Sequence, residues 1–344
     1  AVLQGMNPDT TYYPSKSPIV IPMGLYAPPW VVSGDGPGGP ESVAAATTIS
    51  DNVVFAQLSV DVGPQNTVKT AHKMGITSPL DAVPSITLGT SGVTPLEMAD
   101  AYATLAAGGV HHSPQAIVKV VLSNGKVGWR PSIKGTRAIP AGVASVVTQN
   151  LERVATAGTG SPSGAYFPYT RAGKTGTTEN GWDVWYVGYT PQLAASVWMG
   201  DAEKNSPMNG AYGGTYCAPM WARFFAAALK NQPHPSFAVV PWLFSPWHGK
   251  MQGMSPSASP SSSASPSPGP TNTIKPTVTP KPTPKPTPTT PKPTPTAPKP
   301  TPTATPTKRI ALRTVALTVA PTTGDGSTGL AGEAAGWLAG LFGF

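Results

Sequence analysis

The sequence is poor in the residues that build covalent cross-links, metal sites and membrane spans. Its 344 residues include one cysteine, Cys217, which excludes an intrachain disulfide and a multi-cysteine metal site. The histidines do not favour metal ligation, since His111 and His112 are adjacent and point apart, while His234 and His248 lie among prolines. No long apolar run of membrane-spanning length occurs, so we expect no membrane span. We therefore expect no metal and no other cofactor.

Proline is abundant but unevenly distributed along the chain. Many of the 43 prolines fall between about Ser255 and Thr307, in stretches such as TPKPTPKPTPTT that offer almost no side chain for a core. This shift predicts a folded domain over residues 1–232 and a connector over 233–254. A disordered Pro/Ser/Thr/Lys-rich tail over 255–307 and a low-complexity, apolar and Gly-rich end over 308–344 follow.

Acidic residues are scarce in the second part of the chain. Residues 1–250 carry 15 Lys and Arg against 13 Asp and Glu, whereas residues 251–344 carry 8 against 2. Because the folded part is nearly neutral, it offers no basic surface for a phosphate backbone, and we do not expect nucleic-acid binding. The extended cationic arm suits an anionic wall polymer or a membrane surface, and equally a solvated spacer. The sequence leaves the oligomeric state open.

Helices and hairpins follow one another in the folded part. A helix-favouring stretch begins at Glu41, and apolar residues at helical spacing predict a second helix from Val53 to Val62. Between them, Ser50 or Asp51 has the character of a helix N-cap. Thr94, Pro95 and Glu97 form the sequence signature of a capping box. Further elements are a hairpin around Asn124-Gly125, a helix near 139–156, two antiparallel strands near 183–189 and 193–200, and a helix from 221. This order predicts an α+β domain.

Two short motifs stand at the junctions of these elements. Ser50-Asp51-Asn52 and Lys174-Thr175-Gly176 resemble two of the three motifs of the penicillin-binding proteins and serine β-lactamases. The similarity continues through LGTSGVTPLEMADAYATLAAGG, AGKTGTTENGWDVWYVGYTPQLAASVWMG and GGTYCAPMWARF. Over about residues 1–232 the chain is similar to the transpeptidase domain of a class A, bifunctional penicillin-binding protein. That resemblance implies an antiparallel sheet flanked by helices, together with a helical subdomain.

The resemblance also implies a reaction and roles in it. Such enzymes cleave D-Ala-D-Ala stem peptides of peptidoglycan through an acyl-serine, and β-lactams trap the same serine. Ser50 would pass a proton to the leaving nitrogen, and Asn52 would hold the substrate amide. Lys174, Thr175 and Thr177 would receive the substrate carboxylate. The backbone N–H of Thr177 would donate to the oxyanion, and Gly176 would let the strand lie close to the substrate.

The nucleophile motif of the family, Ser-x-x-Lys, is missing before Ser50. The spacing occurs only at Ser123 and Lys126, on a predicted hairpin turn where the two side chains cannot share a helix face. Since AVLQGM resembles the segment that follows the nucleophile helix in the family, we expect the serine to precede Ala1 and this chain to be inactive alone. The family further implies an upstream glycosyltransferase domain and membrane anchor, at the outer face of the cytoplasmic membrane.

Two alternatives remain open within these patterns. A β-lactamase of the type that deacylates through a glutamate-bound water would need Glu-x-x-x-Asn between the two motifs. Glu97 and Glu152 are followed at that distance by Ala101 and Thr156 instead. The other alternative is a non-catalytic module that binds the wall or senses penicillin. Transpeptidation is favoured over both.

Overall fold

The computed structural model describes residues 1–23, 28–252 and 315–319, and all of them belong to one of the two compact units into which the chain divides. The predicted tail over 255–307 lies outside the described residues. So does the predicted end over 308–344, apart from the backbone of strand β12.

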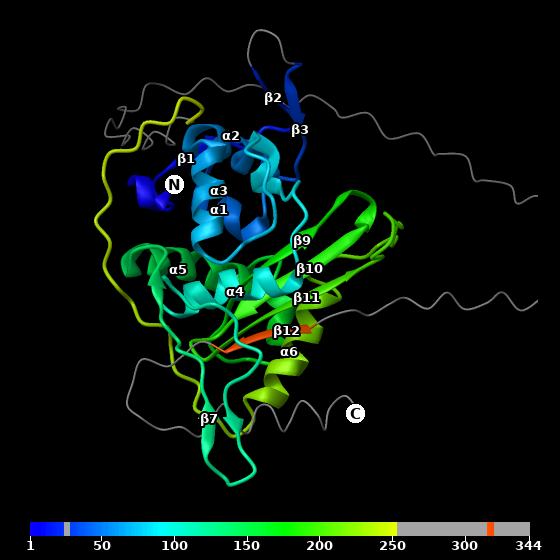
Figure 1. Cartoon of the computed structure of the whole chain (residues 1–344). Coiled ribbons are helices and arrows are strands. Elements are labelled where there is room, and N and C mark those ends of the chain that lie inside the picture. Colours follow the sequence, from blue (N-terminus) through cyan, green and yellow to red (C-terminus); the bar gives the residue numbers. More distant parts are fainter. Residues whose placement is uncertain (24–27, 253–314, 320–344) are drawn as a thin grey trace, which may run out of the picture. The chain divides into compact units, whose positions relative to one another are not determined.

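An antiparallel sheet carries the second motif. Its strand order is β12-β11-β10-β9, so β9 lies at one edge of the described sheet (Figure 1). The strands are β9 (Ala172–Thr177), β10 (Asp183–Tyr189), β11 (Leu193–Gly200) and β12 (Val315–Val319). The motif Lys174-Thr175-Gly176 thus has a strand of its own, separate from the tryptophan-containing strand β10, with Lys174 opposite Val187.

Apolar residues alternate along these strands and supply two cores, one on each face. Tyr189 and Ala194 point into a cluster with α4 (Pro95–Ala106) and α5 (Ala141–Ala157). Tyr186 and Val197 point into the opposite cluster with α6 (Cys217–Ala228), where Trp221 is fully buried. Because neighbouring residues of a strand face opposite ways, the predicted α+β sheet is covered by helices on both sides.

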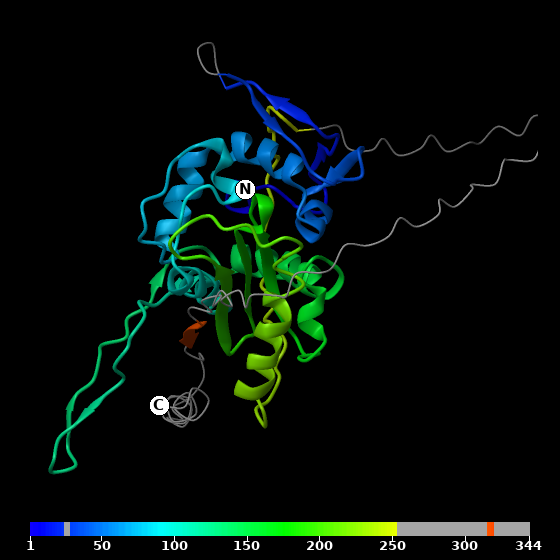
Figure 2. The ribbon, with the colours of Figure 1, turned by 90° about the vertical axis from the view of Figure 1, so that its right-hand side faces the viewer.

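A helical subdomain precedes the sheet in the chain and lies beside one end of it (Figures 1 and 2). Its helices are α1 (Val43–Ile49), α2 (Asn52–Val62) and α3 (Pro64–Lys73). Glu41 belongs to a strand and not to α1, because β4 (Pro40–Ser42) pairs with β1 (Tyr12–Pro14). A second pair joins β2 (Ile19–Ile21) and β3 (Trp30–Val32). Val54 and Leu58 of α2 reach the first core, which therefore spans the subdomain and the sheet.

The hairpin predicted around Asn124-Gly125 is present and extends away from the sheet (Figure 2). Its strands are β6 (Val120–Val121) and β7 (Val127–Trp129), and the pair β5 (Val110–His111) and β8 (Thr136–Arg137) forms its base. Short 3-10 helices complete the described elements: η1 (Val2–Gln4), η2 (Pro84–Leu88), η3 (Ser161–Gly164) and η4 (Glu179–Gly181).

Of the connector predicted over 233–254, the described residues 233–252 have no helix or strand but pack on the domain. Trp242 donates from its indole N–H to the carbonyl of Val2 at 3.2 Å, and Trp247 donates to the hydroxyl of Tyr13 at 3.2 Å. None of the helices in the described part of the chain has the length and apolar character needed to cross a bilayer.

Candidate active site

Ser50 and Lys174 meet where the helical subdomain contacts the sheet. Lys174 Nζ donates to Ser50 Oγ at 2.6 Å and to the carbonyl of Thr175 at 3.1 Å. Ser50 ends α1 with left-handed backbone angles, φ 66° and ψ 44°, and its own N–H bonds to Ala46 O. A left-handed residue is uncommon outside glycine and asparagine, so the chain turns sharply here to begin α2. That turn aims the Ser50 hydroxyl at β9.

Asp51 fixes the turn from the other side. Its carboxylate caps α2 by accepting from the backbone N–H of Val53 at 2.7 Å and of Val54 at 3.4 Å, as predicted for this junction. The Ser15 hydroxyl also donates to it. Asp51 is buried, whereas Asn52, the first residue of α2, is exposed. The capping role and the motif therefore coexist, with Asp51 turned inward.

Lys174 is the electrostatic centre of the site. Its side chain is half-buried at the edge strand, and burial lowers the pKa of Lys174 to about 8. No carboxylate in the described part of the chain lies within 4 Å of its ammonium group. An ammonium group in this environment is stabilised by a ligand anion, because removal from water without a counter-charge is unfavourable.

Two threonines follow Lys174 on β9. Thr175 Oγ1 lies 2.7 Å from Thr159 Oγ1, and Thr177 Oγ1 accepts the backbone N–H of Gly213 at 3.2 Å. Between them, Gly176 lies against Trp185, whose Cβ would be 3.3 Å from a Cβ at residue 176. Strand β9 thus carries Lys174, which bonds to Ser50, and the hydroxyl-bearing residues Thr175 and Thr177.

Thr159 and Gly213 were not identified as site residues from the sequence. Gly213 belongs to the stretch GGTYCAPMWARF that carries the family resemblance, and Thr159 lies between two glycines in the sequence Gly-Thr-Gly, which is typical of a turn. Their proximity to β9 depends on tertiary contacts.

The Ser-x-x-Lys spacing at Ser123 and Lys126 lies on the exposed β6–β7 turn, as expected. Leu122 N–H bonds to Lys126 O at 2.8 Å across this turn, and both side chains are exposed. Ser123 is therefore on a surface hairpin and not on a helix, which removes it as a nucleophile of this motif.

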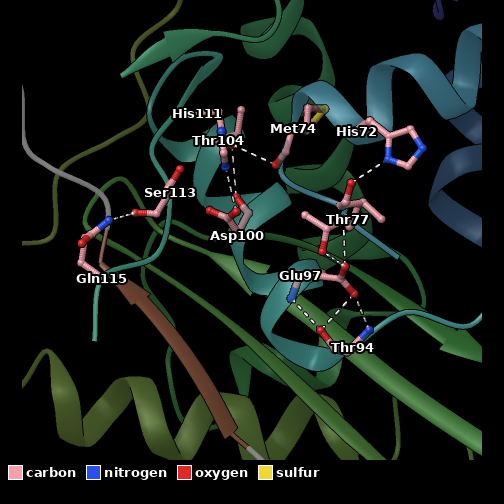
Figure 3. Close-up of polar contacts among 11 residues, drawn as sticks. His72, Met74, Thr77, Thr94, Glu97, Asp100, Thr104, His111, Ser113 and Gln115 are labelled. Atoms are coloured by element: carbon pink, nitrogen blue, oxygen red, sulfur yellow. Dashed lines mark hydrogen bonds and ion pairs between the residues drawn. The ribbon is translucent and has the colours of Figure 1, made fainter. Parts of the chain in front are cut away.

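Glu97 is fully engaged in holding the start of α4 (Figure 3). Its carboxylate accepts from Thr77 N–H at 2.8 Å, Thr77 Oγ1 at 2.7 Å and Thr94 N–H at 2.8 Å, and the predicted capping box is present. Burial alone would raise the pKa of Glu97, but these hydrogen bonds outweigh it and hold the pKa far below its ordinary value. Since it has no capacity left to activate a water, Glu97 does not supply the base of a β-lactamase.

Figure 3 also shows His111 pairing with Asp100. His111 Nε2 lies 2.8 Å from Asp100 Oδ2, and the pair joins the base of the hairpin to α4. This contact gives His111 a structural role. Within residues 1–23, 28–252 and 315–319, no group of three His, Cys, Asp or Glu side chains gathers in a way that could hold a metal ion.

The chain is similar to known proteins in both sequence and fold. Residues 23–226 match the family model of the penicillin binding protein transpeptidase domain. Penicillin-binding protein 2D of Bacillus subtilis is 34% identical over 205 residues, which covers 58% of this chain and 29% of that protein. Among solved structures, the penicillin-binding protein PonA1 of Mycobacterium tuberculosis superposes with TM-score 0.61 at 28% identity, covering 80% of this chain and 73% of that one. A second PonA1 structure, in complex with penicillin V, has TM-score 0.60 at 30% identity over 70% and 68% of the two chains.

These similarities confirm the resemblance to a class A transpeptidase domain and the predicted fold. The chain spans less than a third of the length of the Bacillus relative, so it corresponds to one part of such a protein. With the family model matching residues 23–226, a geometry that joins Ser50 to Lys174, and solved relatives of the same fold, this chain belongs to the penicillin-binding protein transpeptidase family.

Proposed function

We propose that this chain forms most of the acyl-transfer site of a peptidoglycan D,D-transpeptidase that acts on D-Ala-D-Ala stem peptides. The observation that carries the proposal is the contact between Lys174 and Ser50, at 2.6 Å, beside the hydroxyls of Thr175 and Thr177. A cation that has hydroxyl-bearing residues on the same strand, and no acidic partner among the described residues, suits a ligand that ends in a carboxylate.

The substrate carboxylate lies against Lys174, Thr175 and Thr177. Its charge gives Lys174 a counter-ion, which the described residues do not supply within 4 Å. Because Gly176 has no side chain, the backbone of the stem peptide can approach β9 closely at this position. Asn52, exposed at the start of α2, holds the amide of the stem peptide.

The reaction has two acyl-transfer steps. In the first, a serine oxygen bonds to the carbonyl carbon of the penultimate D-alanine, the C–N bond breaks, and the departing D-alanine takes a proton through Ser50. In the second, an amine of a neighbouring stem peptide forms a bond to the ester carbon, the bond to the serine oxygen breaks, and a proton passes from the amine to that oxygen. The backbone N–H of Thr177 is one donor to the oxyanion that forms in both steps.

The acylated serine comes from a Ser-x-x-Lys motif on a helix, whereas the one Ser-x-x-Lys spacing in these 344 residues, at Ser123, lies on the β6–β7 hairpin. None of the residues before Ser50 has that motif. In this proposal, residues 1–232 act within a longer polypeptide that also carries a glycosyltransferase domain, and they are inactive without the serine motif. That protein works at the outer face of the cytoplasmic membrane. The relative PonA1 has been solved in complex with penicillin V, which supports a β-lactam as a ligand of this site too.

Intact mass after incubation with a labelled penicillin tests this function. We expect no adduct on the 344-residue chain and one stoichiometric adduct on a longer polypeptide of the same protein that includes a Ser-x-x-Lys segment. An adduct on this chain, mapped to any of its serines, would refute the assignment of roles. No adduct on the longer polypeptide would favour the second candidate, a non-catalytic module that binds wall peptides, which the absence of the motif also supports.

A further inference from the structure

The hydroxyl oxygens of Thr175 and Thr177 each have a fixed polar neighbour on the protein side. The backbone N–H of Gly213 reaches Thr177 Oγ1 at 3.2 Å, and Thr159 Oγ1 lies 2.7 Å from Thr175 Oγ1. Neither neighbour belongs to the two sequence motifs. Thr159 lies in the loop after α5, and Gly213 lies in the loop before α6. The tertiary fold therefore brings both groups to β9.

Thr159 is exposed to solvent but held on three sides. Its backbone N–H bonds to the carbonyl of Thr48 at 3.2 Å, two residues before Ser50. A Cβ at Gly158 would lie 2.1 Å from the same Thr48 oxygen, and a Cβ at Gly214 would lie 2.4 Å from Thr159 O. The two glycines therefore let neighbouring segments close on Thr159, which fixes its hydroxyl next to Thr175.

The roles of these neighbours follow from the number of protons that each group can donate. A hydroxyl has one proton to donate and lone pairs to accept, whereas a backbone N–H only donates. Thr177 therefore accepts from Gly213, and its own proton is free to point elsewhere. Between Thr159 and Thr175, either hydroxyl can donate while the site is empty. Once a ligand anion accepts a hydrogen bond from the Thr175 hydroxyl, Thr159 is the member of the pair that donates.

The same pattern holds at Ser50. Its oxygen accepts from Lys174 Nζ, so its proton is also free to point away from the lysine. Ser50 and Thr177 thus each accept from a defined donor, and Thr175 accepts in the same way when Thr159 donates to it. A hydroxyl that accepts a hydrogen bond is a stronger donor itself, because the two bonds polarise each other.

We infer that Thr159 and the backbone N–H of Gly213 are positioning groups that fill the acceptor sides of Thr175 and Thr177, so that both hydroxyl protons are presented to a ligand carboxylate. The inference rests on the proposed function, in which a peptide carboxylate binds at Lys174. It assigns to the Gly158–Gly160 turn a part in ligand selection: a carboxylate should be preferred over a neutral amide of the same shape, and Thr159 should contribute to that preference.

The test uses the 344-residue chain and two small probes, N-acetyl-D-alanyl-D-alanine and its C-terminal amide. Binding is followed by NMR titration for the natural chain and the variants Thr159→Val, Thr159→Ser and Thr156→Val. Valine keeps the shape of threonine and removes the hydroxyl. Thr156 is the matched control, since its exposed hydroxyl bonds only to helix carbonyls, with Glu152 O at 2.7 Å.

We expect Thr159→Val to weaken binding of the carboxylate probe about fivefold, the value of one ordinary hydrogen bond, and to leave the amide probe unchanged. Thr159→Ser and Thr156→Val should stay close to the natural chain with both probes. Equal affinities for the two probes in the natural chain would overturn the inference. So would a Thr159→Val variant that binds the carboxylate as well as the natural chain, or one that loses both probes equally.

This outcome is separate from that of the acylation experiment. A carboxylate preference that depends on Thr159 would stand even if the longer polypeptide formed no penicillin adduct. In that case the proposed reaction would be wrong, but the carboxylate-binding role of Thr159 would be retained. An adduct without that preference would uphold the reaction and reject the role of Thr159.

Discussion

Lys174 Nζ and Ser50 Oγ lie 2.6 Å apart although 124 residues separate them along the chain. The contact joins the end of α1 to the edge strand of the sheet, and it has consequences that can be measured in the longer polypeptide and in this chain.

Replacing Lys174 should abolish most of the reaction. Lys174→Ala removes the cation that faces the ligand carboxylate and the donor to Ser50. We expect the second-order rate of penicillin acylation of the longer polypeptide to fall about 100-fold or more. Lys126→Ala, which removes an exposed lysine of the β6–β7 hairpin, is the control and should react normally. A Lys174→Ala protein that is acylated at the natural rate would contradict the role of this residue.

Binding of the carboxylate probe should depend on pH through Lys174. Burial lowers the pKa of Lys174 to about 8 from its ordinary value of 10.5, and only the protonated form attracts an anion. Affinity should be constant near pH 6 and fall as pH rises through about 8. The amide probe should show no such decline. A fall that begins only near pH 10 would show that Lys174 is solvated like a surface lysine.

Asp51 should matter for stability as well as for the site. Asp51→Ala removes the N-cap of α2 and its bonds to Val53 and Val54, so we expect a loss of about 1–2 kcal/mol in the free energy of unfolding, measured by urea titration. Asp51→Asn retains an oxygen acceptor and should recover most of it. For comparison, Asp81→Ala changes an exposed carboxylate and should be nearly neutral. Equal losses for alanine and asparagine would argue against capping as the cause.

Glu97 should make the domain sensitive to acid. Its pKa in the folded state is held far below the ordinary value of 4.5, so its contribution to stability is complete above about pH 4.5 and is lost progressively as pH falls. Glu97→Gln should lower the free energy of unfolding at pH 7 by about 2 kcal/mol, because neutral acceptors bond Thr77 and Thr94 less strongly. Urea titrations at several pH values should show this difference shrinking toward pH 3. A difference that stays constant would mean that packing, and not charge, is responsible.

Local signals in the sequence predicted local structure well. The Thr94 and Glu97 capping box, the Asn124-Gly125 turn and the strands on either side of Thr190-Pro191 depend on residues close together in the chain, and each is present. The helix N-cap at Ser50 or Asp51 is a local signal of the same kind, and Asp51 caps the helix that immediately follows, whereas the motif itself was identified by its resemblance to the family.

Contacts between distant segments were harder to predict. Glu41 has helix-favouring neighbours, but pairing of β4 with β1 places it in a strand, and strands of three residues are too short to show a period. The burial of Lys174 depends on α1 approaching β9. The hydroxyl of Thr159 reaches Thr175 only because glycines at 158 and 214 let three segments close together. No spacing rule in the sequence encodes such an approach.

The first core contains side chains from α1, α2, α4, α5 and the sheet, with Val43, Tyr189 and Ala194 among them. Because this single interior supports both Ser50 and Lys174, their alignment depends on how these elements pack together. A chimera that joins the Ser50 half of one relative to the Lys174 half of another would combine core side chains that do not pack together as they do in either parent. We expect such a chimera to lose the alignment of Ser50 with Lys174 even when every motif residue is retained, so that the natural unit of exchange in this family is the whole domain.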